Sequence, residues 1–156
     1  MYKYCDNNDK YISLHDCRAT RILYKNGIIT FLFEDGIWIA DRHSTNKLGK
    51  IVRTDMAEVK FELALANEAD ITIYMFKEKG KKTIREEWSL SRLIDNVNNR
   101  NCTLEFLYQY RGTGVNVMIV ECCLRKNKKP YHIECELKLL LKDIKYCWNK
   151  LREDSE

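Results

Sequence analysis

The chain alternates apolar and polar residues over most of its length, which is the period of a β-strand with one face against a core. The pattern is clearest in residues 57–66, where charged positions separate the apolar ones. The face expected to be buried carries Ala57, Val59, Phe61, Leu63 and Leu65. We expect a strand here, a turn at 67–70 and a further strand at 71–77.

A β-hairpin is predicted upstream by Asn26 and Gly27, because both residues of a tight hairpin turn must accept a positive φ. The turn joins strands expected at 17–25 and 28–34, and a second glycine turn leads to a short strand at 37–40. We therefore expect these three strands to form an antiparallel meander.

Further strands are predicted in the second half of the chain, at 83–88, 102–110, 115–124 and 131–139. The segment 115–124 is apolar on nearly both faces, which is typical of a central strand. Pro130, the only proline, lies in the turn expected before the last of these strands.

Two segments change to the helical period of three and four residues. The first, 89–99, begins with Ser89, whose hydroxyl can accept a backbone N–H at the start of a helix. The second, 143–151, begins with Asp143 as a plausible N-cap and is expected to dock its Trp148 face on a sheet, since so short a helix is not stable alone.

Together these elements predict an α+β fold. The body is expected to be a mainly antiparallel β meander, in the form of a curved sheet, a split barrel or a two-sheet sandwich, with a short middle helix and a C-terminal helix. A chain of 156 residues is long enough for one domain with its own core, so we expect a single domain over residues 1–156.

Composition and charge exclude several classes of protein. Hydrophobic residues make up 45% and charged residues 32%, which separates the chain from disordered proteins. It has no export signal and no run of about 18 apolar residues, so we expect a cytoplasmic protein without a membrane span. The net charge of +4, with acids and bases interspersed, falls short of a dedicated nucleic-acid-binding domain.

Seven cysteines are many for this length. Their odd number and the lack of an export signal argue against a disulfide framework. No two have the C-x-x-C spacing of a zinc site, and the adjacent Cys122 and Cys123 would point to opposite faces of a strand. We expect free cysteines that serve as small buried apolar residues, and no metal or other cofactor.

Residues 14–18, LHDCR, place a histidine, an acid and a cysteine side by side. On a strand, Asp16 would point away from His15 and Cys17. His15 and Cys17 would then be about 6.6 to 6.8 Å apart, whereas a nucleophile and its base need a contact of roughly 2.6 to 3.2 Å. We therefore expect a packed cysteine beside a partly buried histidine, and no thiol nucleophile.

The longest candidate loop, 42–50, imposes no such alternation, so Asp41 could orient His43 there, with Ser44 next to it. A polar loop without a catalytic role is the alternative. The sequence lacks the HExxH, GxSxG, P-loop and GxGxxG motifs of common catalytic and nucleotide sites. We expect a protein that is not an enzyme.

Two predicted hairpin tips are rich in lysine. Their basic residues are Lys79, Lys81 and Lys82 in one tip and Lys126, Lys128 and Lys129 in the other. These lysines could contact phosphates if both tips extend from the same end of the sheet, and Tyr108, Tyr110 or Tyr131 could offer faces for base stacking. Lysine-rich tips also keep sheet edges soluble. Weak nucleic-acid binding is therefore one hypothesis.

Four segments of the chain, LHDCR, ITFLFEDGIWI, YHIECEL and IKYCWNKL, resemble a set of small bacterial proteins without an assigned activity. Members of that set have a β-rich body and end in a tyrosine followed by Trp-Asn. The resemblance spans most of the chain, carries over no catalytic residue and implies a bacterial, intracellular protein. Some small β-rich bacterial proteins are immunity proteins or toxin antagonists, which is an analogy of fold alone.

The first hypothesis for function is a non-enzymatic module that contacts an unidentified protein partner, or a second copy of itself, through a sheet face or a loop rim. Its aromatic anchors would be Trp38, Trp88 and Tyr110, with core packing as the alternative for each. Weak nucleic-acid binding and an immunity-like antagonist of a toxin are alternative hypotheses. A thiol enzyme that pairs Cys17 or Cys135 with a distant histidine is a further one.

Overall fold

The computed structural model describes residues 1–154, which form an antiparallel β-protein with one α-helix and one short 3-10 helix. The helices are η1 (Glu68–Asp70) and α1 (Leu90–Asn99). The strands are β1 (Tyr4–Asp6), β2 (Ile12–Ser13), β3 (Cys17–Ala19), β4 (Arg21–Lys25), β5 (Ile28–Phe33), β6 (Trp38–Ile39), β7 (Val52–Arg53), β8 (Ala57–Leu63), β9 (Ile71–Lys79), β10 (Lys82–Trp88), β11 (Thr103–Arg111), β12 (Val117–Arg125) and β13 (His132–Trp148). Neither of these described helices is long and apolar enough to cross a membrane.

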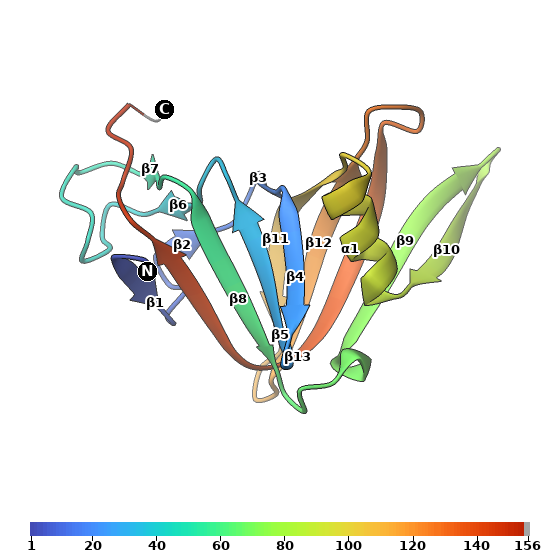
Figure 1. The fold of residues 1–156 in the computed structure, drawn as a ribbon, viewed down its shortest axis with the longest axis horizontal. Helices are drawn as coiled ribbons and strands as arrows, with labels where there is room; N and C mark the ends of the chain where they lie inside the picture. Colours follow the sequence, from blue (N-terminus) through green and yellow to red (C-terminus); the bar gives the residue numbers. More distant parts are fainter. Residues whose placement is uncertain (155–156) are drawn as a thin grey trace.

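Ten of the described strands form one strongly curved sheet, which appears as two diverging arms in Figure 1. Its main path runs β3-β11-β12-β13-β8-β5-β4, and every pairing is antiparallel. The two strands at the ends of this path, β3 and β4, are consecutive in the chain. β3 is held in the sheet by only three residue pairs with β11. The predicted antiparallel body is confirmed, as a curved sheet that does not close into a barrel.

Strand β13 holds the two arms together. Its first part pairs with β12 and β9, and from Leu141 onward it pairs with β8 and then β1, with an irregularity between Leu141 and Asp143. The predicted C-terminal helix over 143–151 is therefore wrong. Buried Ile144, Tyr146 and Trp148 alternate along the strand, because pairing with neighbouring strands overrides a weak helical period.

The Asn26-Gly27 hairpin is confirmed, with φ of 54° and 74° at the two turn residues and β4 paired with β5. The meander is wrong in its third strand, because the second neighbour of β5 is β8 and not β6. Gly36 explains this departure: its φ is +79°, and a Cβ there would collide with the carbonyl of Thr54. The chain turns out of the large sheet at this glycine.

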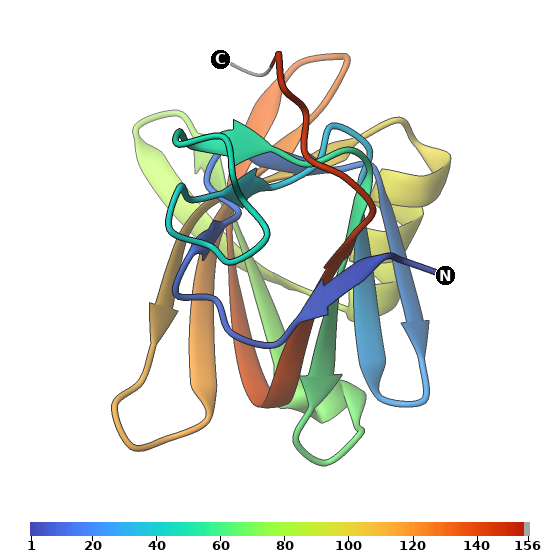
Figure 2. The ribbon, with the colours of Figure 1, turned by 90° about the vertical axis from the view of Figure 1, so that its left-hand side faces the viewer.

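Strand β6 belongs instead to a second, three-stranded sheet with the order β2-β6-β7. Figure 2 shows this small sheet and the loop that follows β6 on the side of the molecule where β1 lies. The loop closes over Asn46, whose side-chain amide donates to the carbonyls of Ile39, Ala40 and Lys50. The predicted long loop at 42–50 is thus an ordered loop.

The core lies between the two arms of the large sheet. Phe31 of β5 and Phe106 of β11 pack edge to face, with ring centroids 5.1 Å apart. Most of the predicted face of β8 is buried, namely Ala57, Val59, Phe61 and Leu63. Leu65 was expected to be buried with them and is 80% exposed, because β8 ends before it.

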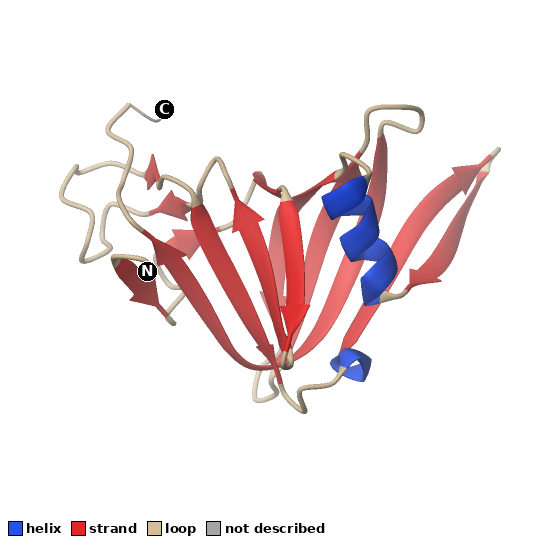
Figure 3. Ribbon diagram, viewed as in Figure 1, coloured by secondary structure: helices blue, strands red, loops and turns tan. Residues whose placement is uncertain are grey.

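The predicted middle helix is confirmed as α1, and the hydroxyl of Ser89 accepts the backbone N–H of Arg92 as its N-cap. Figure 3 shows this helix beside β4, at the end of the sheet path. Asn98 donates through its amide nitrogen to the carbonyl of Ile22 and accepts the Ile22 N–H, at 2.7 and 2.8 Å. The Asn98 side chain thus makes the two backbone hydrogen bonds of Ile22 that a neighbouring strand would otherwise make with β4.

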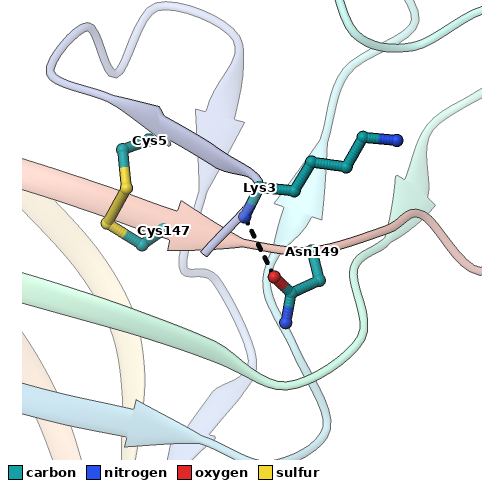
Figure 4. Close-up of a disulfide and its surroundings, with 4 residues drawn as sticks. All are labelled: Lys3, Cys5, Cys147 and Asn149. Carbon is teal, nitrogen blue, oxygen red and sulfur yellow. Dashed lines mark hydrogen bonds between the residues drawn. A yellow bond between two sulfur atoms is a disulfide. The ribbon is translucent and has the colours of Figure 1, made fainter. Parts of the chain in front are cut away.

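A disulfide joins Cys5 of β1 to Cys147 of β13, across directly opposed positions of the two strands (Figure 4). Beside it the backbone N–H of Lys3 donates to Oδ1 of Asn149 at 3.0 Å. The expectation of seven free cysteines is wrong for this pair, because pairing in the fold opposes residues that are 142 apart in sequence. The other cysteines are free and buried, as predicted: Cys17, Cys102, Cys122, Cys123 and Cys135.

Candidate nucleic-acid interface

Two lysine-rich hairpins extend from the same end of the sheet. β9 and β13 are antiparallel neighbours with Phe76 opposite Glu134, so the turn after β9 and the turn before β13 lie side by side. Both are at the upper right in Figure 1. Residues 77–82 and 126–129 hold seven lysines between them. The condition on which the nucleic-acid hypothesis depends is therefore met.

A groove of about 480 Å³ lies between these hairpins. Its lining includes Phe76, Lys77, Lys79, Thr83, Tyr131 and His132. Tyr131 is 57% exposed. Two acids, Glu78 and Glu134, also line the groove, and lysines outnumber acids over the two hairpins.

A second hollow, of about 330 Å³, continues the positive surface toward the C-terminal end of α1. It is lined by Arg100 and Cys102 and by residues 126–128 of the β12–β13 turn. Arg100 is held by Asp95 at 2.9 Å. Burial raises the pKa of the Cys102 thiol despite Lys126 nearby, so this cysteine is not an activated thiolate.

We call this surface the basic end. It comprises Lys79, Lys81, Lys82, Arg100, Lys126, Lys128, Lys129 and Tyr131. Tyr110 is not part of it: the residue is 51% exposed but lies near the opposite end of β11, where Arg111 pairs with Met118. Tyr108 is exposed on the same far stretch of β11.

The two tryptophans proposed as contact anchors each pack against an arginine of the same chain. Trp88 is only 6% exposed, and the guanidinium of Arg92 lies 4.1 Å from its ring centroid. Trp38 is half-buried beneath the guanidinium of Arg53, and its Nε1 donates to the carbonyl of His15. Buried Trp88 therefore offers a partner no open aromatic face, and Arg53 occupies one face of the Trp38 ring.

The LHDCR segment is a turn that leads into β3, and Asp16 has a φ of 59°. The expectation that Asp16 points away from His15 is wrong, because Oδ2 of Asp16 lies 3.3 Å from Nε2 of His15. The other ring nitrogen of His15 lies 2.6 Å from the carbonyl oxygen of Leu107, which leaves no imidazole contact for Cys17. Burial raises the pKa of the Cys17 thiol to about 11, which favours the protonated thiol at neutral pH.

An ion-pair cluster around a buried carboxylate lies next to this turn, and no local pattern in the sequence predicts it. Glu105 is 5% exposed and binds Arg18 and Arg125, each at 2.9 Å. Burial opposes ionisation of this carboxyl, but hydrogen bonds from Arg125 and Arg18 outweigh it and hold the Glu105 pKa below its usual value. The three residues meet because β3, β11 and β12 are neighbouring strands.

His43 is buried, but its partner is neither of the residues that the loop sequence suggested. Nε2 of His43 lies 2.8 Å from Oδ2 of Asp6 in β1, and Nδ1 lies 2.8 Å from the hydroxyl of Thr45. Asp41 and Ser44 are exposed. This contact connects the loop to β1. The carboxylate comes from a residue of that strand, which is far from the loop in sequence.

Among residues 1–154, no group of three or more His, Cys, Asp or Glu side chains is placed to hold a metal ion. A comparison of the chain with protein-family models, curated proteins and solved structures finds no match.

Proposed function

We propose that the protein binds single-stranded nucleic acid at its basic end, as a non-enzymatic cytoplasmic protein. One observation carries the proposal: the two lysine-rich hairpins lie side by side and flank a groove with an exposed tyrosine. Lysines that track a phosphate backbone supply affinity, and an aromatic face stacks a base of any sequence.

The geometry changes the order of the hypotheses drawn from the sequence. Contact with an unidentified protein through Trp38 and Trp88 loses support, since Trp88 is buried and an arginine of the same chain lies over each ring. Nucleic-acid binding by the lysine-rich tips gains support, because the pairing of β9 with β13 brings the two tips side by side.

Binding of this kind is expected to depend little on base sequence. Lysine is a flexible point charge that contacts phosphates, whereas sequence is read by fixed donors and acceptors against base edges. Single strands fit the site better than duplex, because stacking on Tyr131 needs an unpaired base.

The test is fluorescence anisotropy with a labelled single-stranded thymidine oligonucleotide at low salt. The test variant carries Lys126→Gln, Lys128→Gln and Lys129→Gln. The matched control carries Lys25→Gln, Lys47→Gln and Lys50→Gln, which removes the same charge from exposed positions elsewhere. We expect at least a tenfold loss of affinity in the test variant and little change in the control. No binding by the wild type, or an equal loss in both variants, would refute the proposal.

A further inference from the structure

The outer edge of β10 has no neighbour in the fold. Within residues 1–154, this strand pairs with β9 on one side and with no strand on the other. It lies at the right-hand margin of the sheet in Figure 1. An unpaired edge presents N–H and C=O groups that can pair with another strand. Ile84, the third residue of this strand, is apolar and 41% exposed.

The charged residues along this edge are basic before Ile84 and mainly acidic after it. Lys81 and Lys82 precede it, Arg85 follows it directly, and Glu86 and Glu87 come next. An antiparallel copy of the same strand, centred on Ile84, therefore sets the basic half of one edge against the acidic half of the other. Opposite charges at directly opposed positions stabilise a strand pair.

The pairing register follows from symmetry. A two-fold axis normal to the sheet keeps each side chain on its own face, so with Ile84 opposite itself Lys82 faces the second copy's Glu86. Lys81 likewise approaches the second copy's Glu87, and each contact occurs twice. Centring the pair on Arg85 would instead oppose two like charges, which destabilises a strand pair.

We propose that two copies of the chain associate through antiparallel pairing of their β10 edges, centred on Ile84. The large sheet then continues across the dimer. The contact is one strand wide, which belongs to the small class of interfaces and predicts a reversible dimer that forms at high protein concentration. Lys81 and Lys82 belong to both surfaces, so nucleic-acid binding is tested separately, with Lys126, Lys128 and Lys129 on the other hairpin.

The charge pattern is tested by sedimentation velocity over a concentration series of the full chain. Lys81→Glu or Glu87→Lys alone creates two like-charge contacts per dimer, so each variant is expected to be monomeric. An equimolar mixture of the two variants restores both contacts and is expected to recover the dimer, as is the double variant. Both positions are exposed, so circular dichroism should show the same fold in all of these proteins.

The register is tested by oxidative cross-linking. Ile84→Cys opposes two thiols across the two-fold axis, whereas Thr83→Cys places each thiol opposite Arg85 and serves as the matched control. The native free cysteines are buried, which keeps background cross-linking low. We expect a covalent dimer from the first variant and little from the second. A monomeric wild type at the highest concentration reached, association that ignores the charge reversals, or equal cross-linking at both positions would overturn the proposal.

Discussion

Nε2 of His43 lies 2.8 Å from Oδ2 of Asp6, which joins the loop after β6 to the first strand of the chain. The backbone N–H of Thr45 donates to Nδ1 of His43 at 3.2 Å, so Nδ1 is an acceptor and Nε2 carries a proton. Nε2–H therefore donates to the carboxylate. Burial alone would raise the Asp6 pKa, but hydrogen bonds from the Asn8 N–H and from His43 bring it below its usual value.

Asp6→Ala is expected to lower the free energy of unfolding by about 1 to 3 kcal/mol, because it leaves the buried Nε2–H of His43 without an acceptor. Urea unfolding monitored by tryptophan fluorescence measures the change. Asp41→Ala is the control, since this exposed carboxylate in the same loop should alter stability by no more than about 0.5 kcal/mol. Equal effects of the two changes would contradict the assignment of Asp6 as the partner of His43.

The ion pairs of Glu105 predict a dependence of stability on pH. Their contribution is fully present above the usual carboxyl pKa of 4.5 and is lost as the pH falls through the lower pKa of the folded state. At pH 7, Glu105→Gln should lower the free energy of unfolding by about 2 kcal/mol, because the hydrogen bonds to Arg18 and Arg125 lose their charge. Unfolding titrations should show the gap between variant and wild type closing toward pH 3. A gap of constant size would contradict this account.

Reduction of the Cys5–Cys147 disulfide should lower the free energy of unfolding by about 2 to 4 kcal/mol, since the bridge closes a long loop in the unfolded chain. Cys5→Ser should show the same loss and should no longer respond to reductant. Thermal unfolding with and without dithiothreitol measures both effects. Cys135→Ser, at a buried free cysteine, is the control that must keep the response to reductant. A wild-type protein indifferent to reductant would contradict the prediction.

Local signals in the sequence predicted the elements that depend on neighbouring residues. Asn26 and Gly27 supply the positive φ of their hairpin, and Ser89 caps α1 as expected, because a turn or a cap involves a few adjacent residues. The C-terminal helix failed for the opposite reason. Residues from Ile144 to Trp148 fit both periods, and pairing with β8 and β1 decides between them.

The residues of the candidate site were predicted from the sequence, but their proximity in the fold was not. The lysines of both tips follow from the hairpin pattern, whereas their proximity depends on Phe76 lying opposite Glu134. The partners of His43 and Glu105 are 37 and 87 residues away in sequence, Asp6 in the first case and Arg18 in the second. A single sequence shows such pairs only once strand order is known.

Tyr146→Phe is expected to raise the free energy of unfolding by about 1 kcal/mol. In the described part of the chain the Tyr146 hydroxyl is buried without a hydrogen-bond partner, and burial raises its pKa. Removing an unsatisfied polar atom while the ring is kept relieves a desolvation cost. Tyr131→Phe, which removes an exposed hydroxyl, is the control for stability. A clear loss of stability in Tyr146→Phe would show that the hydroxyl is satisfied in solution and would contradict the prediction.

The contributions of phosphate contacts and of base stacking to binding at the basic end can be separated by measuring the affinity at several salt concentrations. For a single strand, each phosphate contact contributes about −0.7 to the slope of log affinity against log salt. The variant with three glutamines at Lys126, Lys128 and Lys129 should therefore have a slope shallower by about 2 if each lysine neutralises one phosphate.

Tyr131→Ala should weaken binding of single strands by about 1 to 3 kcal/mol through loss of stacking, with the salt slope unchanged because no charge is removed. Tyr131→Phe keeps the aromatic face and should bind like the wild type. Tyr110→Ala is the matched control, because this exposed tyrosine lies at the other end of β11 and should leave affinity unchanged. Anisotropy titrations at several salt concentrations give both affinity and slope. Equal losses from Tyr131→Ala and Tyr110→Ala would place the bound strand away from the groove between the two lysine-rich hairpins.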